Sequence, residues 1–282
     1  MTDQFALSRP PAAPEHAPRH VVGLRALRGV LSRDTVPIIV LPVGAALAAL
    51  LLWQLLVHVI DVPAAILPPP SDIVGQIAAH YGLLLKHAVP TTLETLLAFA
   101  IAIPLGILLA ALMTCSTTIN RAFYPNIVFF QLIPKIALAP MFIVWLGIGL
   151  PSRVTFAVFI SFFPILVATA TGLQAVSREM VRLCRSVGAS DWQILFYVRF
   201  PTSLPYIFSG MKIAVTLAII GIVVGEFIAS QAGLGYLILF ASSRQQADLG
   251  LACIVVLCAV GLVLYGAVVL GERAMMKLYG DR

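Results

Sequence analysis

Residues 177–201 read SREMVRLCRSVGASDWQILFYVRFP, a polar stretch inside an otherwise apolar chain. Good helix formers precede Gly188, and a glycine in that place favours a left-handed cap that ends a helix. Ser190 and Gln193 then have the spacing of a capping box, which predicts the start of a second helix, with Pro201 expected to stop it. The stretch therefore predicts two short helices joined at a glycine elbow.

The first of these helices carries two stripes at helical spacing. An apolar stripe consists of Met180, Cys184 and Val187, and a basic stripe consists of Arg178, Arg182 and Arg185. Such faces suit either the hydrophobic groove of a partner or lipid headgroups. A chain that keeps so long a charged loop between apolar segments is expected to present it to something outside the bilayer.

The composition of the whole chain indicates an integral membrane protein. Hydrophobic residues make up 60% of the 282 and charged residues only 11%, and the mean hydropathy is +1.01, whereas an average soluble domain is about 25% charged. The net charge of +6 comes from basic residues beside apolar runs, which favours membrane topology over nucleic-acid binding. The four cysteines have no metal-ligand spacing, so we expect neither a metal site nor a bound cofactor.

The apolar runs predict an all-α protein with six membrane spans, since about 20 residues are needed to cross about 30 Å of hydrocarbon. The expected spans are 36–60, 88–113, 122–147, 154–171, 206–229 and 249–270. Arginines and lysines gather before the first span, after the fourth and after the sixth, which places both termini and the 177–201 loop in the cytoplasm.

This topology divides the chain into three parts. Residues 1–35 are expected to be a cytoplasmic, Pro-rich segment that includes a short amphipathic helix on the membrane surface. Residues 36–272 form the six-span domain with its loop at 177–201, and residues 273–282 form a cytoplasmic tail. In the connection after the fifth span, Gly233 and Gly235 favour a close approach of backbone to its neighbours.

The loop and several other motifs resemble one family. Gly188 to Gln193, followed by Val198 to Pro201, resembles the "EAA" coupling loop of binding-protein-dependent ABC importer permeases, in which nine residues separate the glycine from an Ile-x-Leu-Pro sequence. Arg182-Leu183-Cys184 stands where that family usually has Glu-Ala-Ala, which suggests a partner matched to a basic loop. Further motifs look like the nitrate, sulfonate and taurine branch: Leu67-Pro-Pro-Pro-Ser71, Pro134-Lys-Ile-Ala-Leu-Ala-Pro140, Trp145-Leu-Gly-Ile-Gly149, Phe163-Pro164 and Gly233-Leu-Gly-Tyr236.

The resemblance implies a type I importer permease in the bacterial inner membrane. It implies an assembly of two permeases, two cytoplasmic ATPases and an extracytoplasmic solute-binding protein. The chain has no Gly-x-x-x-x-Gly-Lys-Ser/Thr phosphate cradle, so ATP would be hydrolysed in a separate subunit and this chain would be no enzyme. The residues expected to couple to the ATPase are Arg182, Leu183, Cys184, Gly188, Ala189, Ser190, Trp192 and Pro201.

Three ionisable residues inside the expected spans are candidates for the translocation path, because such groups are costly in a bilayer and usually face a cavity or a partner. They are Glu94, Lys135 and Glu226. A lysine near mid-membrane favours an anionic solute. The alternatives are an ion pair of Lys135 with either glutamate, or a side chain that extends to the membrane surface. Pro134 and Pro140 flank Lys135 and are expected to break the helix there.

The sequence leaves the solute open between two classes. One is a small anion such as a sulfonate, taurine or nitrate, and the other is an aromatic or pyrimidine-type precursor, since near relatives of this branch share these motifs. An ion-coupled secondary transporter is the alternative from another class of protein. That class predicts inverted repeats and coupling-ion ligands in both halves of the chain, and the sequence shows no convincing repeat.

Overall fold

The computed structural model describes residues 35–115 and 117–280, and every regular element in these ranges is helical. The chain divides into residues 1–53 and residues 54–282. The described part of the first unit lies entirely in helix α1 (Thr35–Ile60). The amphipathic helix expected near the N-terminus falls outside the described residues. The all-α prediction is confirmed.

Five helices are long and apolar enough to cross a membrane. They are α1, α3 (Tyr81–Cys115), α6 (Leu150–Gln174), α9 (Phe200–Ala229) and α11 (Ala247–Gly280). They cover the first, second, fourth, fifth and sixth expected spans. Their ends extend beyond the apolar runs, and α11 continues to Gly280 through much of the segment assigned to the tail.

The third expected span is a bent pair of helices rather than one continuous helix. Helix α4 (Thr117–Leu132) ends before Pro134, and a 3₁₀ turn, η2 (Lys135–Leu138), leads into α5 (Ala139–Leu146). The segments meet at 87°. A proline lacks the backbone N–H and disfavours helical geometry in the residue before it, which accounts for a break at Pro134. Six spans result if the bent pair counts as one.

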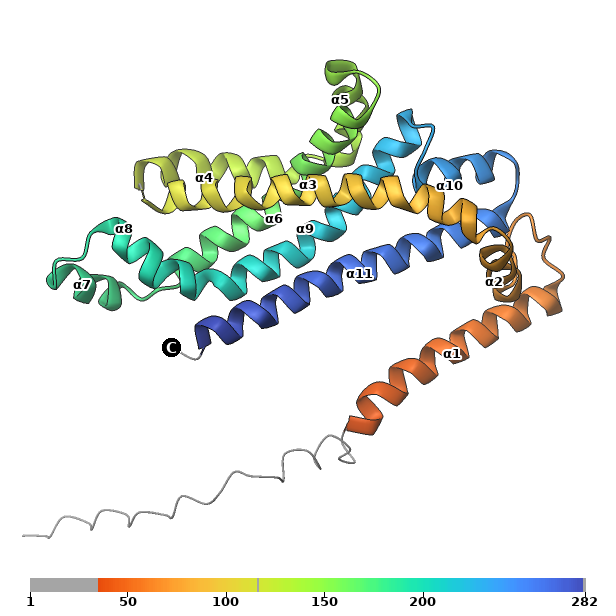
Figure 1. Cartoon of the computed structure of the whole chain (residues 1–282), viewed down its shortest axis with the longest axis horizontal. Coiled ribbons are helices and arrows are strands. Elements are labelled where there is room, and N and C mark those ends of the chain that lie inside the picture. Colours follow the sequence, from red (N-terminus) through yellow and green to blue (C-terminus); the bar gives the residue numbers. More distant parts are fainter. Residues whose placement is uncertain (1–34, 116, 281–282) are drawn as a thin grey trace, which may run out of the picture. The chain divides into compact units, whose positions relative to one another are not determined.

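Some of the shorter helices of residues 54–282 lie at the two ends of α3, α6, α9 and α11 (Figure 1). Helices α2 (Pro70–Ala79) and α10 (Leu234–Ser243) lie at one end. At the other end lie α7 (Arg178–Ser186) and α8 (Asp191–Ile194), which are the two helices expected around Gly188. The polar loop is therefore placed where α6 ends and α9 begins.

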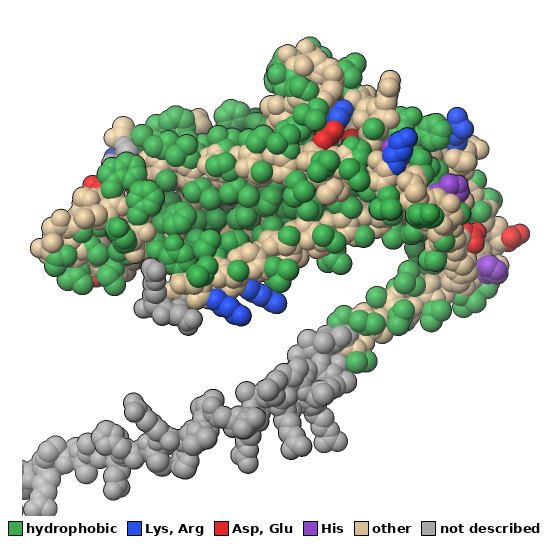
Figure 2. All heavy atoms as spheres, in the orientation of Figure 1, with side chains coloured by type: hydrophobic (Ala, Val, Ile, Leu, Met, Phe, Trp, Pro, Cys, Tyr) green, Lys and Arg blue, Asp and Glu red, His purple; other side chains and the backbone are tan. Residues whose placement is uncertain are grey.

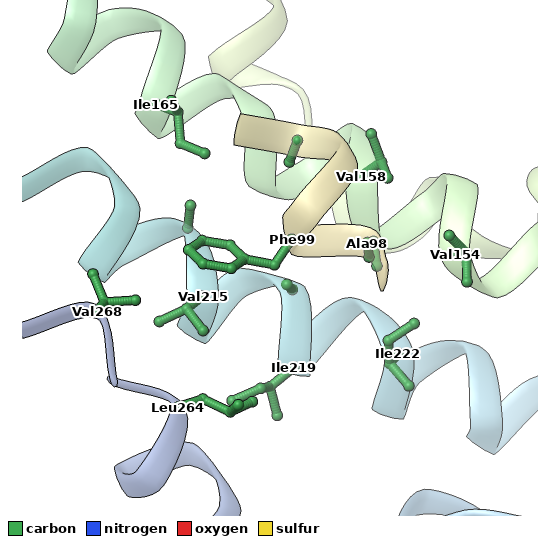
Figure 3. Close-up of a cluster of buried hydrophobic side chains, with 14 of the residues drawn as sticks. Ala98, Phe99, Val154, Val158, Ile165, Val215, Ile219, Ile222, Leu264 and Val268 are labelled. Carbon is green, nitrogen blue, oxygen red and sulfur yellow. The ribbon is translucent and has the colours of Figure 1, made fainter. Parts of the chain in front are cut away.

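Helix α6 is the centre of the packing, with α9 and α3 against it. Contacts along the chain show that α6 and α9 run antiparallel: Gly221 lies against Ala157, and Gly172 lies against Ser203. Figure 3 shows the apolar cluster between α3, α6, α9 and α11, in which Phe99 is surrounded by aliphatic side chains. Hydrophobic side chains also cover most of the outer face in Figure 2, as expected where lipid replaces water.

Substituting Gly221 tests the close approach of α6 and α9. A Cβ atom at this position would lie 2.7 Å from Cα of Ala157, a backbone atom that cannot move without shifting the helix. We expect Gly221→Ala to destabilise the protein by about 1–3 kcal/mol, the usual cost of overpacking. Gly266→Ala is the matched control, because nothing lies within 4 Å of that position in α11.

Thermal unfolding of the full chain in detergent measures both variants. The expected result is a lower melting temperature for Gly221→Ala and an unchanged one for Gly266→Ala. Equal melting temperatures would contradict the packing described for α6 and α9.

Candidate functional site

The polar loop has the local structure that its sequence predicts. Ser177 caps α7, and its hydroxyl accepts a hydrogen bond from the backbone N–H of Met180. Gly188 ends the helix with φ +82°, a conformation that side chains disfavour. Ser190 and Gln193 then form the expected capping box: the Ser190 hydroxyl accepts from the Gln193 N–H, and the Gln193 side chain accepts from the Ser190 N–H. Two helices joined by a glycine elbow are confirmed.

The prediction that Pro201 stops the second helix is wrong. Helix α8 passes through a π-helical turn, η3 (Leu195–Arg199), directly into α9. Pro201 lies in the first turn of α9, where its missing N–H costs little, and the wider π turn precedes it. The loop is therefore joined to the long helix α9 without a flexible link.

The loop exposes large apolar side chains. On α7, Leu183 is 60% exposed and Cys184 is partly buried, while Trp192 on α8 is 63% exposed. The Trp192 ring stacks on Phe196 with 5.9 Å between centroids. Across the elbow, Arg185 Nη2 donates to Asp191 Oδ1 at 2.9 Å. The result is an ordered hairpin whose apolar surface has no partner in the described part of this chain.

A shallow cavity of about 370 Å³ lies on this hairpin. Its lining consists of Cys184, Val187, Gly188, Ala189, Gln193, Ile194, Tyr197 and Val198. Three of the residues expected to couple to an ATPase, Cys184, Gly188 and Ala189, thus meet at one concave surface. Arg182 faces another cavity on the loop.

Glu94 forms a buried ion pair with Arg153. The guanidinium Nε of Arg153 donates to Glu94 Oε2 at 2.8 Å, and Nη2 donates to Oε1. Only 12% of the Arg153 side chain and 9% of the Glu94 side chain are exposed. A third contact joins Arg153 Nη1 to the carbonyl of Ala229 at 3.4 Å. The pair therefore ties together α3, the start of α6 and the end of α9.

Glu226 holds the beginning of α10. Its buried carboxylate accepts a hydrogen bond of 2.7 Å from the Thr91 hydroxyl and another of 2.7 Å from the Gly235 N–H. The Thr91 hydroxyl oxygen also accepts from the Leu234 N–H at 2.8 Å. A Cβ atom on Gly235 would lie 2.8 Å from Glu226 Oε2. This contact explains the glycine and agrees with the close approach expected at Gly233 and Gly235.

Lys135 lies apart from both glutamates. Its ammonium donates to the carbonyl of Gln131 at 3.2 Å and lies 5.3 Å from the centroid of the Phe163 ring. A cavity of about 350 Å³ is lined by Lys135 and Gln131 together with Phe163 and other residues of α6 and α9. In the described ranges the ion pairs are Arg153–Glu94, Arg185–Asp191 and Lys212–Glu272, and none includes Lys135.

The partners of the Glu94 and Glu226 carboxylates were not predicted from the sequence. Neither Arg153 nor Thr91 was singled out in the sequence. A signal for the first pair exists, because Glu94 and Arg153 lie near the same ends of two spans that run in the same direction. A further ion pair joins α9 to α11, in which the Lys212 ammonium lies 2.6 Å from Glu272 Oε2. Among the described residues no cluster suited to a metal ion is found.

The comparisons with known proteins agree on one family. The family model described as "Binding-protein-dependent transport system inner membrane component" matches residues 102–277. This range covers more than half of the chain and includes the hairpin of α7 and α8, Lys135, Arg153 and Glu226.

Three curated relatives are similar over most of their length. The riboflavin transport system permease protein of Chloroflexus aurantiacus is 35% identical over 88% of this chain and 92% of its own. The formylaminopyrimidine transport permease protein of Halalkalibacterium halodurans is 38% identical over 67% of this chain and 76% of its own. The taurine transport system permease protein of Escherichia coli is 26% identical over 85% and 88%, respectively.

A solved structure has the same fold. An inward-facing structure of the MetNI methionine ABC transporter gives a TM-score of 0.62 at 18% identity, covering 70% of this chain and 98% of that chain. At this identity the likeness concerns the fold alone.

The ion pair of Glu94 and Arg153 should matter more to stability than the pair of Arg185 and Asp191. Glu94→Gln leaves a buried guanidinium without its charge partner, which typically costs about 3–5 kcal/mol. Asp191→Asn is the matched control, since the exposed pair is worth about 0–1 kcal/mol. Thermal unfolding in detergent should show a large fall for Glu94→Gln and little change for Asp191→Asn.

The double variant Glu94→Gln with Arg153→Met completes this test. Because it removes the unpaired charge, we expect it to lose less stability than the sum of the two single variants. Additive losses would show that the two side chains do not interact.

Proposed function

Because the chain belongs to the family of binding-protein-dependent transport system inner membrane components, it is the permease of an ABC importer, and we propose that it works as one half of a permease pair. Each pair binds two cytoplasmic ATPase subunits and receives solute from an extracytoplasmic binding protein. The chain itself is a multi-pass inner-membrane protein. Its termini and the hairpin of α7 and α8 face the cytoplasm, which the excess of arginines and lysines beside these segments supports.

The hairpin is the observation that carries the proposed coupling. It leaves Trp192 and Leu183 exposed, and its capped helices hold these side chains in fixed positions. It is also joined at both ends to the α6–α9 pair, which is closely packed. An ATPase that grips the hairpin would therefore move two packed spans together, as rigid-body switching requires.

In this proposal the separate ATPase subunits supply the energy for transport. The sequence contains no phosphate cradle of the Gly-x-x-x-x-Gly-Lys-Ser/Thr type, so ATP binding and hydrolysis are assigned to the separate ATPase. Nucleotide then shifts the inward-open and outward-open populations only as far as it binds one state better than the other. The permease contributes the path and the mechanical link.

The three ionisable residues expected on the path are proposed to divide into two roles. Glu94 and Glu226 are both held in buried contacts, which supports a role in fixing α3, α9 and α10 beside the path. Lys135 has no carboxylate partner in the described ion pairs and borders a cavity. These contacts support Lys135 as the residue that meets the solute.

Two solute classes are supported by different observations. Identities of 35% and 38% with permeases named for riboflavin and formylaminopyrimidine favour a heteroaromatic precursor. The ammonium of Lys135 favours a small anion. Similarity to a taurine permease supports the same class, although the identity is lower, at 26%. Purification in mild detergent, followed by identification of the ligand held by the copurifying binding protein, decides between the two classes.

Trp192→Asp should abolish most coupled transport without preventing assembly of the permease. The substitution places a charge on the apolar surface of the hairpin, where it would have to be desolvated against the ATPase. We expect ATP-driven uptake in proteoliposomes to fall by at least tenfold, since each 1.4 kcal/mol of lost interaction is a factor of ten. Trp192→Phe keeps an aromatic ring for Phe196 and is expected to retain most uptake. Full uptake by Trp192→Asp would rule out this surface as the coupling site.

Lys135→Ala separates the two solute classes by their transport. An anion that meets the ammonium should lose about tenfold in its initial uptake rate, whereas a neutral heteroaromatic solute should lose little. Lys135→Arg, which keeps the charge, is the control. Unchanged uptake of an anionic solute by Lys135→Ala would make Lys135 a structural residue.

A further inference from the structure

The basic stripe of α7 lines a second cavity on the hairpin. Its lining shares no residue with the cavity that includes Cys184 and Gly188. The cavity has a volume of about 460 Å³. Its lining consists of Thr114, Leu173, Gln174, Val176, Arg178, Val181, Arg182, Arg185 and Arg199. Four arginines thus meet at one concave surface, and the lining includes no aspartate or glutamate.

Most of this positive charge has no partner in the described part of the chain. Arg185 pairs with Asp191, but no ion pair is formed by Arg178, Arg182 or Arg199. The Nε atom of Arg199 is also buried without a hydrogen-bond partner. A buried, unsatisfied guanidinium N–H is costly, and a bound anion would satisfy it.

The sequence of the loop accounts for the lack of a carboxylate partner among the described residues. Arg182 occupies the position at which the resembling coupling loops usually carry the glutamate of Glu-Ala-Ala. A carboxylate there would face the other arginines of this cavity. This chain has a fourth positive charge there instead, so the described residues leave the charge of the cavity unbalanced and open to a bound anion.

We propose that this cavity binds a phosphate-bearing anion, and specifically the headgroup of an anionic phospholipid of the cytoplasmic leaflet. Thr114 and Gln174 lie at the ends of the spans α3 and α6, which places the cavity at the depth of lipid phosphates. Leu173, Val176 and Val181 add apolar wall, which suits the glycerol and upper acyl region of a lipid. The apolar surface of the hairpin stays available to the ATPase.

The inference rests on the cytoplasmic placement of the hairpin in the proposed function, but its test does not depend on transport. Native mass spectrometry of the full chain measures how much phosphatidylglycerol stays bound, with phosphatidylcholine as the reference lipid. Each basic charge near an anionic leaflet contributes enough for about a fivefold change in binding, so we expect about fivefold weaker binding for Arg182→Gln and about thirtyfold for Arg182→Glu. Arg273→Gln, an equal charge change on the exposed end of α11, measures the general attraction to the leaflet and should weaken binding less than Arg182→Gln does.

Competition with millimolar inorganic phosphate distinguishes the two sources of the phosphate group. Persistence of bound phosphatidylglycerol supports a lipid site, whereas full displacement by phosphate would overturn the lipid assignment in favour of a soluble anion. Equal retention of phosphatidylglycerol by Arg182→Glu and the unchanged chain would overturn the proposal.

A second measurement covers the case in which Arg182→Glu fails to fold. Arg182→Lys keeps the charge and should retain the lipid, and the melting temperature of each variant is compared with and without phosphatidylglycerol. We expect the lipid to raise the melting temperature of the unchanged chain and of Arg182→Lys. If instead Arg182→Gln weakens binding of the purified ATPase and leaves lipid binding unchanged, the cavity accepts an acidic side chain of the ATPase and the proposal is wrong.

Discussion

The close packing of α6 against α9 is the contact on which the rest of the structure depends. Glycines on both helices make it possible: Gly221 meets the backbone of Ala157, Gly210 meets that of Ile165, and Gly172 meets that of Ser203. In lipid, where apolar surface alone gives no preference for a neighbouring helix, such close approach is a main source of association. The pair then supports α3 on one side and α11 on another.

This packing determines how a force on the hairpin of α7 and α8 would be transmitted. Since α7 and α8 connect the end of α6 to the start of α9, the hairpin is anchored at both ends to helices that are packed against each other. At the opposite end, Glu226 and the Glu94–Arg153 pair fasten α10 and α3 to the same helices. A displacement of the hairpin would therefore be transmitted to the far end of the spans by closely packed helices that bend little.

The sequence predicted what depends on neighbouring residues and missed what depends on tertiary contact. The apolar runs, the elbow at Gly188 and the box of Ser190 with Gln193 are local patterns, and the structure confirms them. The path of the chain through Pro201 was mispredicted, because the expectation that a proline ends a helix did not allow for the π turn of Leu195–Arg199 before it. The partner of Glu94 was likewise missed, since Arg153 lies 59 residues further along the chain.

In the proposed function, the ATPase binds the hairpin of α7 and α8. The most direct measurement places a photo-crosslinking side chain at position 192, and in a separate variant at position 262, where Leu262 is 73% exposed in the span α11. In membranes containing the whole importer, we expect an adduct with the ATPase subunit from position 192 and none from position 262. The absence of an ATPase adduct from position 192 in an importer that transports its solute would contradict the claim.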